Sequence, residues 1–205
     1  MTLGSLYIIS APSGAGKTSL INALIESVES IEVSVSHTTR PMRDGEIDGR
    51  HYHFVDTDTF ESGIAEGLFL EHAKVFENYY GTSRSSVHQR LEEGIDVILE
   101  IDWQGAQQIR QLMPDNTSVF ILPPSIEELE RRLTSRNQDS AEVIERRVSQ
   151  AKADAKHFTE YDHAIVNDDF TEALTALSSI FRSKRSEIAK TQLRHQALLT
   201  SLLQD

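Results

Sequence analysis

The first candidate site is a short loop of small residues between an apolar run and a helical pattern. The segment LYIISAPSGAGKTSLINALI, Leu6–Ile25, carries GAGKT at the spacing typical of a loop that cradles phosphate groups. Backbone N–H groups around the glycines can point at phosphate oxygens, Lys17 can reach the β- and γ-phosphates, and the Thr18 hydroxyl can bind Mg²⁺. The usual first glycine is Ala11 here, which is tolerable if that residue has a negative φ.

A glycine-rich helix start without a ligand is the alternative for this loop. The apolar run before it and the helical pattern after it favour a nucleotide site instead.

A second candidate site lies in the segment SVSHTTRPMRDGEIDGRHYHFV, Ser34–Val55, which offers Ser36, Arg40, Arg43 and Tyr52. Two guanidinium groups three residues apart, with a phenol, suit a monophosphate dianion. A solvated polar loop is the alternative.

A lone carboxylate, Glu71, lies between apolar residues of the segment FLEHAKVFENYYGTS. A glutamate in such a setting is usually exposed at an edge. His51 and His53 are two residues apart, but no further ligand falls at a metal-binding spacing, so we expect no histidine metal site.

Composition excludes several classes of protein. The 205 residues carry a formal net charge of -12, which argues against sequence-independent binding to nucleic-acid backbones. There is no cysteine, which rules out disulfides and thiolate metal sites and fits a reducing compartment. We see neither a signal peptide nor a membrane-spanning run, and therefore expect a cytoplasmic protein without membrane contacts.

The elements that would position these residues alternate between strands and helices. The pattern predicts strands at Leu6–Ser10, Ile31–Ser36, His51–Val55, Asp96–Asp102, Ser118–Pro124 and His163–Asn167, and helices at Thr18–Ser27, Thr59–Gly67 and Ser85–Gly94. This alternation favours an α/β fold with a parallel sheet covered by helices. The turn-rich segment 36–80 interrupts the rhythm and reads as an insertion. The chain after Pro124 has neither Gly nor Pro and is predicted to be mostly helical, ending in a basic stretch, Arg182–Gln196.

Five motifs together resemble the guanylate kinase family, in its bacterial form. They are SGAGKT, TTRPMRDGEIDGRHYHFV, NYYGTS, LEIDWQGAQQIR and IVNDD, within a resemblance that runs from about Leu6 to Phe181. The second motif is far more specific than the phosphate loop. The resemblance implies a P-loop NTPase-like parallel sheet flanked by helices, with the core at 1–35 and 84–205. It also implies an inserted GMP-binding subdomain at 36–83 and a helical lid at about 125–157.

The resemblance also implies a role for each site residue. The implied ATP-binding residues are Ser13, Gly14, Ala15, Gly16, Lys17, Thr18 and Asn167, with Asn167 facing the ATP base. The implied GMP-binding residues are Ser36, Arg40, Arg43, Tyr52, Glu71, Tyr80, Thr82, Glu100 and Asp102. The implied catalytic residues are Lys17, Arg40, Arg43 and the lid arginines Arg132, Arg136 and Arg147. Glu100 stands where the family commonly has Asp, and Asn137 where a Gly is common.

The implied activity is transfer of the γ-phosphoryl group of ATP to GMP, and to dGMP, with Mg²⁺ as cofactor. The chemistry of guanine supports it independently, because Ser36 can donate to O6 while Glu71 accepts from N1–H and N2–H₂. Two alternatives stay open: an inactive guanylate-kinase-like interaction module, and a related kinase of a sugar bisphosphate. A homo-oligomer through the basic C-terminal stretch is a further expectation.

Overall fold

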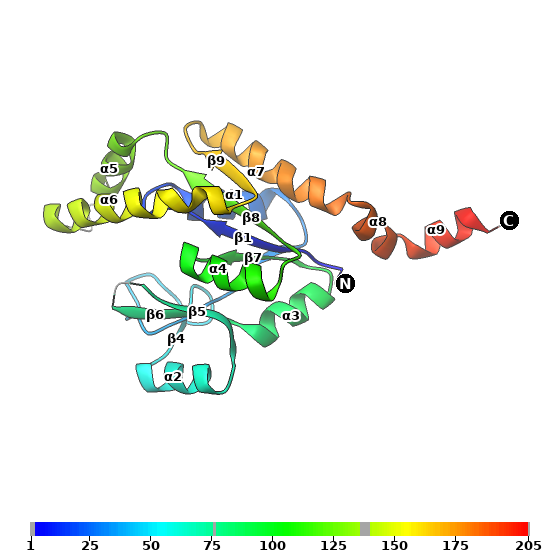
Figure 1. Cartoon of the computed structure of the whole chain (residues 1–205), viewed down its shortest axis with the longest axis horizontal. Coiled ribbons are helices and arrows are strands. Elements are labelled where there is room, and N and C mark those ends of the chain that lie inside the picture. Colours follow the sequence, from blue (N-terminus) through cyan, green and yellow to red (C-terminus); the bar gives the residue numbers. More distant parts are fainter. Residues whose placement is uncertain (1–2, 76, 136–139, 205) are drawn as a thin grey trace.

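A five-stranded parallel sheet forms the centre of the chain (Figure 1). The computed structural model describes residues 3–75, 77–135 and 140–204. The strand order is β2-β7-β1-β8-β9, with β1 at Leu6–Ser10, β2 at Ile31–Val33, β7 at Asp96–Glu100, β8 at Asn116–Leu122 and β9 at His163–Val166. Every residue of β1 is buried. A central parallel strand covered on both faces needs such a continuous run of mostly apolar residues.

Helices cover both faces of this sheet. On one face, α1 (Lys17–Ser27) and α7 (Phe170–Arg185) pack against the sheet, and Phe181 stacks on Tyr7 with 3.7 Å between ring centroids. On the other face, α3 (Arg84–Glu92) and α4 (Trp103–Leu112) bury Leu6 and Ile8. Successive β1 side chains therefore enter opposite cores, and the loop after β1 is held rigidly at the carboxyl edge of the sheet.

A smaller four-stranded sheet lies beside α4 (Figure 1). Its order is β4-β3-β6-β5, with β3 at His37–Thr38, β4 at His53–Phe54, β5 at Phe69–Val75 and β6 at Asn78–Ser83. Helix α2 (Thr57–Ala65) packs on it through Phe60, whose ring stacks on Phe69 at 4.4 Å. Because β5 also contacts α4, this sheet presents its residues to the central sheet.

A pair of helices follows β8. Helices α5 (Ile126–Ser135) and α6 (Ala141–Ala155) pack through Leu129, Leu133 and Ala151. The 3₁₀ helix η1 (Lys156–Glu160) returns the chain to α4, where His157 stacks on Trp103 with 3.8 Å between centroids. Trp103 is therefore a packing residue, which joins α4 to η1.

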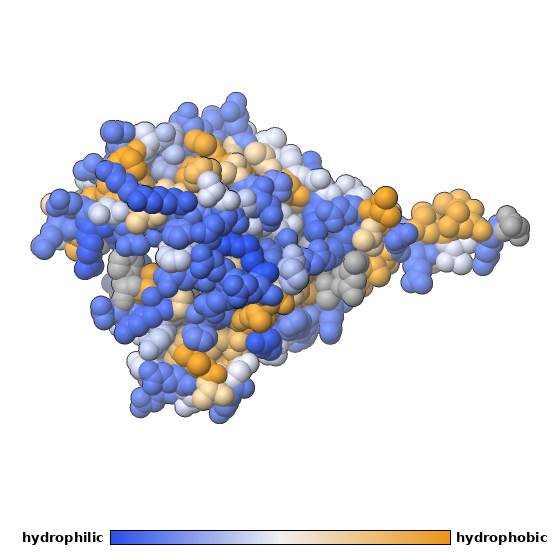
Figure 2. All heavy atoms as spheres, in the orientation of Figure 1, coloured by the Kyte–Doolittle hydropathy of each residue, from blue (hydrophilic) through white to orange (hydrophobic). Residues whose placement is uncertain are grey.

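The C-terminal arm, α8 (Ile188–Arg194) and α9 (Gln196–Leu203), projects away from the rest of the chain (Figure 1). Its base is anchored, because Lys190 is buried and donates to the Gly4 carbonyl at 2.8 Å. Its tip exposes apolar side chains, including Leu202 at 68% and Leu203 at 80% (Figure 2).

The predicted elements are present with shifted ends. The strands expected at Ile31–Ser36 and His51–Val55 are shorter, and the helix expected from Thr59 begins at Thr57, where the Asp56 carboxylate caps it. Strands β3, β5 and β6 were not predicted. Across the described residues, no helix is both long and apolar enough to cross a membrane.

Candidate active site

The phosphate loop between β1 and α1 has the backbone that its sequence requires. Gly14 and Gly16 both have φ of 91°, a left-handed conformation that favours glycine. Within the described part of the chain, Ser30 is the one non-glycine residue with positive φ, so Ala11 does not need to be glycine. The condition on which Ala11 was tolerable is therefore met.

The loop is supported from beneath by Asn167, which directly follows β9. Its side chain is buried and donates to the Ala15 carbonyl at 2.8 Å. A Cβ at Gly16 would lie 2.4 Å from the Asn167 amide nitrogen, so the two residues approach too closely for any side chain at 16. Asn167 thus holds the loop backbone, and its implied contact with the ATP base stays a prediction.

Arg132 of α5 reaches the same place. Its guanidinium donates to the Asn167 carbonyl at 3.1 Å, and to the Ala15 carbonyl at 3.5 Å. Glu128 holds it from the other side at 2.7 Å, and hydrogen bonds from Arg131 and then Arg132 lower the pKa of Glu128 to about 2. These hydrogen bonds place Arg132 at the loop without any use of the family resemblance.

Glu100, at the end of β7, faces the phosphate loop directly. Its carboxylate accepts from the Thr18 hydroxyl at 2.6 Å and lies 3.4 Å from the Lys17 ammonium. Burial raises the pKa of Glu100, but the Lys17 charge and the hydrogen bonds outweigh burial and leave that pKa below its usual value. The family resemblance placed Glu100 among the GMP residues, whereas its hydrogen bond and its ion pair are with Thr18 and Lys17.

A cavity of about 320 Å³ separates the phosphate loop from the smaller sheet. Its walls bring together Ala11, Ser13, Lys17, Ser36, Tyr52, Glu71, Val75, Tyr80, Glu100, Ile101 and Asp102. Loop residues and acceptor residues from segments far apart in the chain therefore line one space. Thr82 lies behind this cavity, buried, with its hydroxyl donating to Glu71 at 2.6 Å.

Glu71 is buried with 4% exposure, so the alternative of a glutamate exposed at an edge does not hold for it. It projects from β5 between the smaller sheet and α4. Burial raises the pKa of Glu71 to about 7, the hydrogen bond from Thr82 opposes the rise, and the charge of Asp102 adds to it. Burial likewise raises the pKa of Asp102, whose carboxylate caps α4 by accepting from the Gly105 N–H at 2.9 Å.

A second cavity, of about 720 Å³, adjoins the first and shares Tyr52, Tyr80 and Glu100 with it. Arg40 and Arg43 both line it. The Arg40 guanidinium lies 5.4 Å from the centre of the Tyr52 ring. The two predicted guanidinium groups and the phenol therefore converge on one space.

Sequence reasoning missed Glu46, which forms an ion pair with Arg40 in this structure. Their charged groups are 2.6 Å apart, and the same carboxylate accepts from the Arg43 N–H at 2.7 Å. The hydrogen bond from Arg40 holds the pKa of Glu46 below its usual value. The signal was available, because an acidic residue six positions after Arg40 in a turn-rich segment can fold back on it.

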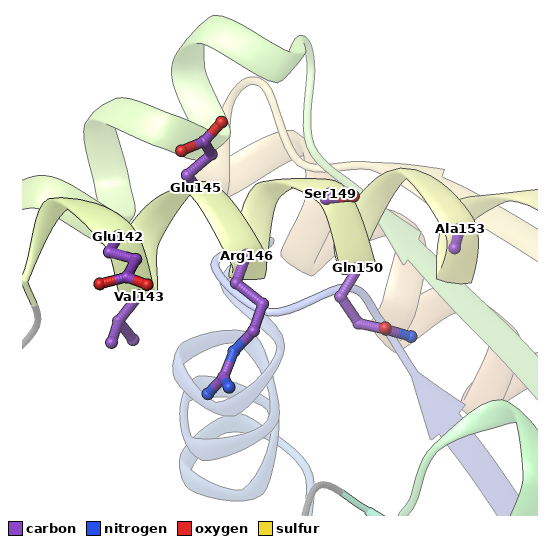
Figure 3. Close-up of a pocket in the computed structure, with 7 residues that line it drawn as sticks. All are labelled: Glu142, Val143, Glu145, Arg146, Ser149, Gln150 and Ala153. Atoms are coloured by element: carbon purple, nitrogen blue, oxygen red, sulfur yellow. The ribbon is translucent and has the colours of Figure 1, made fainter.

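The remaining lid arginines are Arg136 and Arg147. Arg136 and Asn137 lie outside the described residues. Arg147 is half-buried on α6, on the side of Ile144 and Val148. Its neighbour Arg146 instead lines a cavity of about 630 Å³ along α6, and Figure 3 shows Val143, Arg146 and Gln150 extending from one side of that helix.

The oxygen donors at the loop fit a magnesium ion shared with a nucleotide. Thr18 and Glu100 offer a hydroxyl and a carboxylate side by side. The described residues hold no group of three or more His, Asp or Glu side chains that could bind a metal ion. Mg²⁺ commonly binds through one or two protein oxygens, substrate phosphates and water, so this small donor set matches it.

Comparisons with known proteins agree with this geometry. The family model described as guanylate kinase matches residues 4–184. The guanylate kinase of Sodalis glossinidius (strain morsitans) is 58% identical over 207 residues, and that of Escherichia coli (strain K12) 56%, each alignment covering 100% of both chains. The crystal structure of guanylate kinase from Anaplasma phagocytophilum has a TM-score of 0.80 and 34% identity, covering 100% of this chain and 98% of that one.

Proposed function

The chain belongs to the guanylate kinase family, and we propose that it transfers the γ-phosphoryl group of ATP to GMP, giving ADP and GDP. The observation that carries this proposal is the shared cavity. It joins Lys17 of the phosphate loop to Ser36 and Glu71, which suit the edge of guanine. A donor phosphate and an acceptor nucleotide would meet there.

The phosphate loop is the proposed ATP site. Ser13, Gly14 and Gly16 offer backbone N–H groups, and Lys17 offers its charge to the β- and γ-phosphates. Ala15 lies between the two glycines, and its own N–H donates to the Pro12 carbonyl at 3.1 Å. Thr18 and Glu100 would hold Mg²⁺, and the ion would supply positive charge to the phosphate oxygens. Asn167 and Arg132 keep the loop in its binding conformation.

The second cavity is the proposed site for the acceptor phosphate. Arg40, Arg43, Tyr52 and Tyr80 line it, and a dianion would form charge-assisted hydrogen bonds with them. The Glu46 carboxylate would compete with this phosphate, because it already accepts from one nitrogen of the Arg40 guanidinium at 2.6 Å. Neutralising the acceptor phosphate lets its oxygen approach the γ-phosphorus.

The smaller sheet is the proposed GMP-binding unit, and its buried carboxylate is the proposed reader of the base. Ser36 would donate to guanine O6, and Glu71 would accept from N1–H and N2–H₂, with Thr82 and Asp102 completing the pocket. Adenine would present an acceptor at N1 to the Glu71 carboxylate. Leaving buried polar groups unpaired in this way gives discrimination of about 10⁴ or more.

The transfer step is mainly positioning and charge neutralisation, because phosphoryl transfer passes through a loose transition state. The acceptor oxygen is already ionised, so no general base is required. It forms a bond to the γ-phosphorus as the bond to the β-phosphate oxygen breaks, and ADP leaves with that oxygen. Lys17 and the lid arginines Arg132, Arg136 and Arg147 would stabilise the moving group. Closure of residues 125–157 would exclude water.

The alternatives have less support. An inactive interaction module has no need of Lys17, Thr18, Arg40 and Arg43, all of which are present and line the two cavities. A kinase of a sugar bisphosphate has no need of Ser36 and a buried Glu71. Coupled assays with GMP, dGMP, AMP and a sugar bisphosphate in parallel test the proposal. Turnover limited to guanine nucleotides is expected, and equal turnover of AMP or the sugar would contradict it.

We also propose that the chain forms a homo-oligomer through the C-terminal arm. Ile188, Leu198, Leu202 and Leu203 expose 56–80% of their surface there. Exposed apolar surface of this kind is typical of interaction sites. Light scattering of the wild type and of a Leu202→Glu/Leu203→Glu chain tests this: the wild type should be larger than a monomer and the variant smaller than the wild type. A monomeric wild type contradicts it.

A further inference from the structure

A glycine in α4 has no backbone reason to be glycine. Gly105 is the third residue of that helix and is buried, and its φ lies outside the left-handed region. Alanine is the better helix former at such a position, because glycine loses more conformational freedom on folding. The reason for glycine must therefore lie in what surrounds its α-carbon.

That surrounding group is the Glu71 carboxylate. A Cβ at position 105 would lie 2.6 Å from Oε2 and 3.2 Å from Cδ of Glu71. The first distance is shorter than a methyl group tolerates, and the second would require the carboxylate to move by a few tenths of an ångström. The Ile101 side chain, at 3.4 Å, is in ordinary contact. An alanine at 105 would therefore push against Glu71 and against little else.

The strand that carries Glu71 is not free to back away. The Gln108 side chain, one turn further along α4, accepts from the His72 N–H at 3.2 Å and donates to the His72 carbonyl at 2.7 Å. On the opposite side, Thr82 donates to Glu71 Oε1 at 2.6 Å. Backbone and carboxylate are thus both held, and a methyl group at 105 would have to displace the carboxylate itself.

We propose that Gly105 is a positioning residue for base recognition: its bare α-carbon lets the Glu71 carboxylate lie against the first turn of α4 at the angle that reads guanine. The inference rests on the proposed role of Glu71. The same turn places Asp102 beside the cavity, because the Asp102 carboxylate accepts from the Gly105 N–H. One residue therefore orients two acidic groups at the base.

The test is Gly105→Ala in the full chain, measured with GMP, AMP and ATP. We expect the GMP KM to rise about tenfold to a hundredfold, the range for a misplaced binding group. The GMP-to-AMP ratio of kcat/KM should narrow, and the ATP KM should stay unchanged. The matched control is Gly63→Ala. Gly63 is also helical, and its added Cβ would meet apolar side chains, the nearest being Phe69 at 3.0 Å. The control should leave the GMP-to-AMP ratio unchanged.

A rescue experiment separates positioning from packing. In a Glu71→Ala chain the obstructing carboxylate is gone, so adding Gly105→Ala should raise the melting temperature, as alanine does in a helix. If Gly105→Ala does not fold by itself, recovery of folding in the Glu71→Ala chain supports the inference, and continued failure overturns it. A rise in the ATP KM equal to that for GMP also overturns it.

The two proposals fail in different ways. If Glu71→Gln leaves the GMP-to-AMP ratio unchanged, the proposed role of Glu71 is wrong, whatever Gly105→Ala does. If Glu71→Gln narrows that ratio and Gly105→Ala leaves it unchanged, only the inference about Gly105 is wrong.

Discussion

Replacing Glu71 by glutamine should damage recognition of GMP while stabilising the fold at alkaline pH. The substitution keeps the volume and an oxygen that can accept from Thr82, but it removes the charge. Burial raises the pKa of Glu71 from 4.5 to about 7. Its carboxyl is therefore easier to ionise in the unfolded chain than in the folded one.

The size of the stability effect follows from that shift. A group whose pKa is higher in the folded state loses stabilising influence as pH rises from its unfolded value to its folded value. At about 1.4 kcal/mol per pKa unit, the wild type should lose about 3 kcal/mol between pH 4.5 and pH 8 through this one side chain. Glutamine does not titrate, so the variant should lack this loss.

Whereas the substitution should stabilise the fold at pH 8, it should lower catalytic efficiency with GMP. Guanine loses one charge-assisted hydrogen bond, worth about 1.5–3 kcal/mol, so kcat/KM for GMP should fall roughly ten- to a hundredfold. Adenine can accept from the new amide, and the GMP-to-AMP ratio should narrow. In the wild type the GMP KM should also fall as pH rises through about 7, because GMP binds the ionised carboxylate. This dependence of the GMP KM on pH should be absent in the variant.

Two measurements check this reasoning. Urea unfolding of both chains at pH 5 and pH 8 should show the variant gaining roughly 2–3 kcal/mol relative to the wild type over that interval. The second measurement is the GMP KM of both chains as a function of pH. The GMP phosphate itself titrates near pH 6, and comparing the two chains cancels that contribution. If the stability difference is the same at both pH values, Glu71 has no raised pKa. An unchanged GMP-to-AMP ratio would show that it does not touch the base.

Three further substitutions probe other parts of the site. Lys17→Ala should lower kcat about a hundredfold or more, the scale of losing a charge-stabilising group, with an unchanged circular dichroism spectrum; full activity would refute the phosphate-loop assignment. Arg40→Ala should raise the GMP KM about tenfold or more and lower kcat. A larger effect on the ATP KM would contradict the proposed contact of Arg40 with GMP. Asn167→Ala removes the bond to Ala15 and should raise the ATP KM roughly fivefold or more; an unchanged ATP KM would remove its proposed support of the loop.

The central sheet was predictable because its strands are buried on both faces. The segment at Leu6–Ser10 is a short run of mostly apolar residues, and the helix after it follows directly from its own periodicity. Such patterns depend on neighbours in the sequence. The positive φ values at Gly14 and Gly16 are also a local property, because glycine itself permits that conformation.

The hairpin of β5 and β6 was not predictable from local alternation. Phe69, Leu70 and Glu71 are buried in succession, and the pairing register shifts between Phe69 and Glu71. That irregularity breaks the two-residue period by which strands are identified. The burial of Glu71 arises from α4 and β6 together, so no window around residue 71 contains the information.

Contacts between distant segments account for the rest of the site. Asn167 meets Ala15 across 152 positions, and Glu100 meets Thr18 across 82. A motif identifies such residues as functional without saying what they touch. For Asn167 the resemblance indicated a contact with the ATP base, whereas in the structure its side chain donates to the loop backbone.

The ion pair of Arg40 and Glu46 has a kinetic consequence. If Arg40 binds the acceptor phosphate as proposed, the Glu46 carboxylate would compete with that phosphate for the same guanidinium. This competition would weaken the binding of substrate and product alike, and Glu46 would pair with Arg40 again as the phosphate leaves. Dissociation of GDP would then replace one anion at Arg40 by another. Glu46 would thus speed product release, in a class of reaction where release often limits turnover.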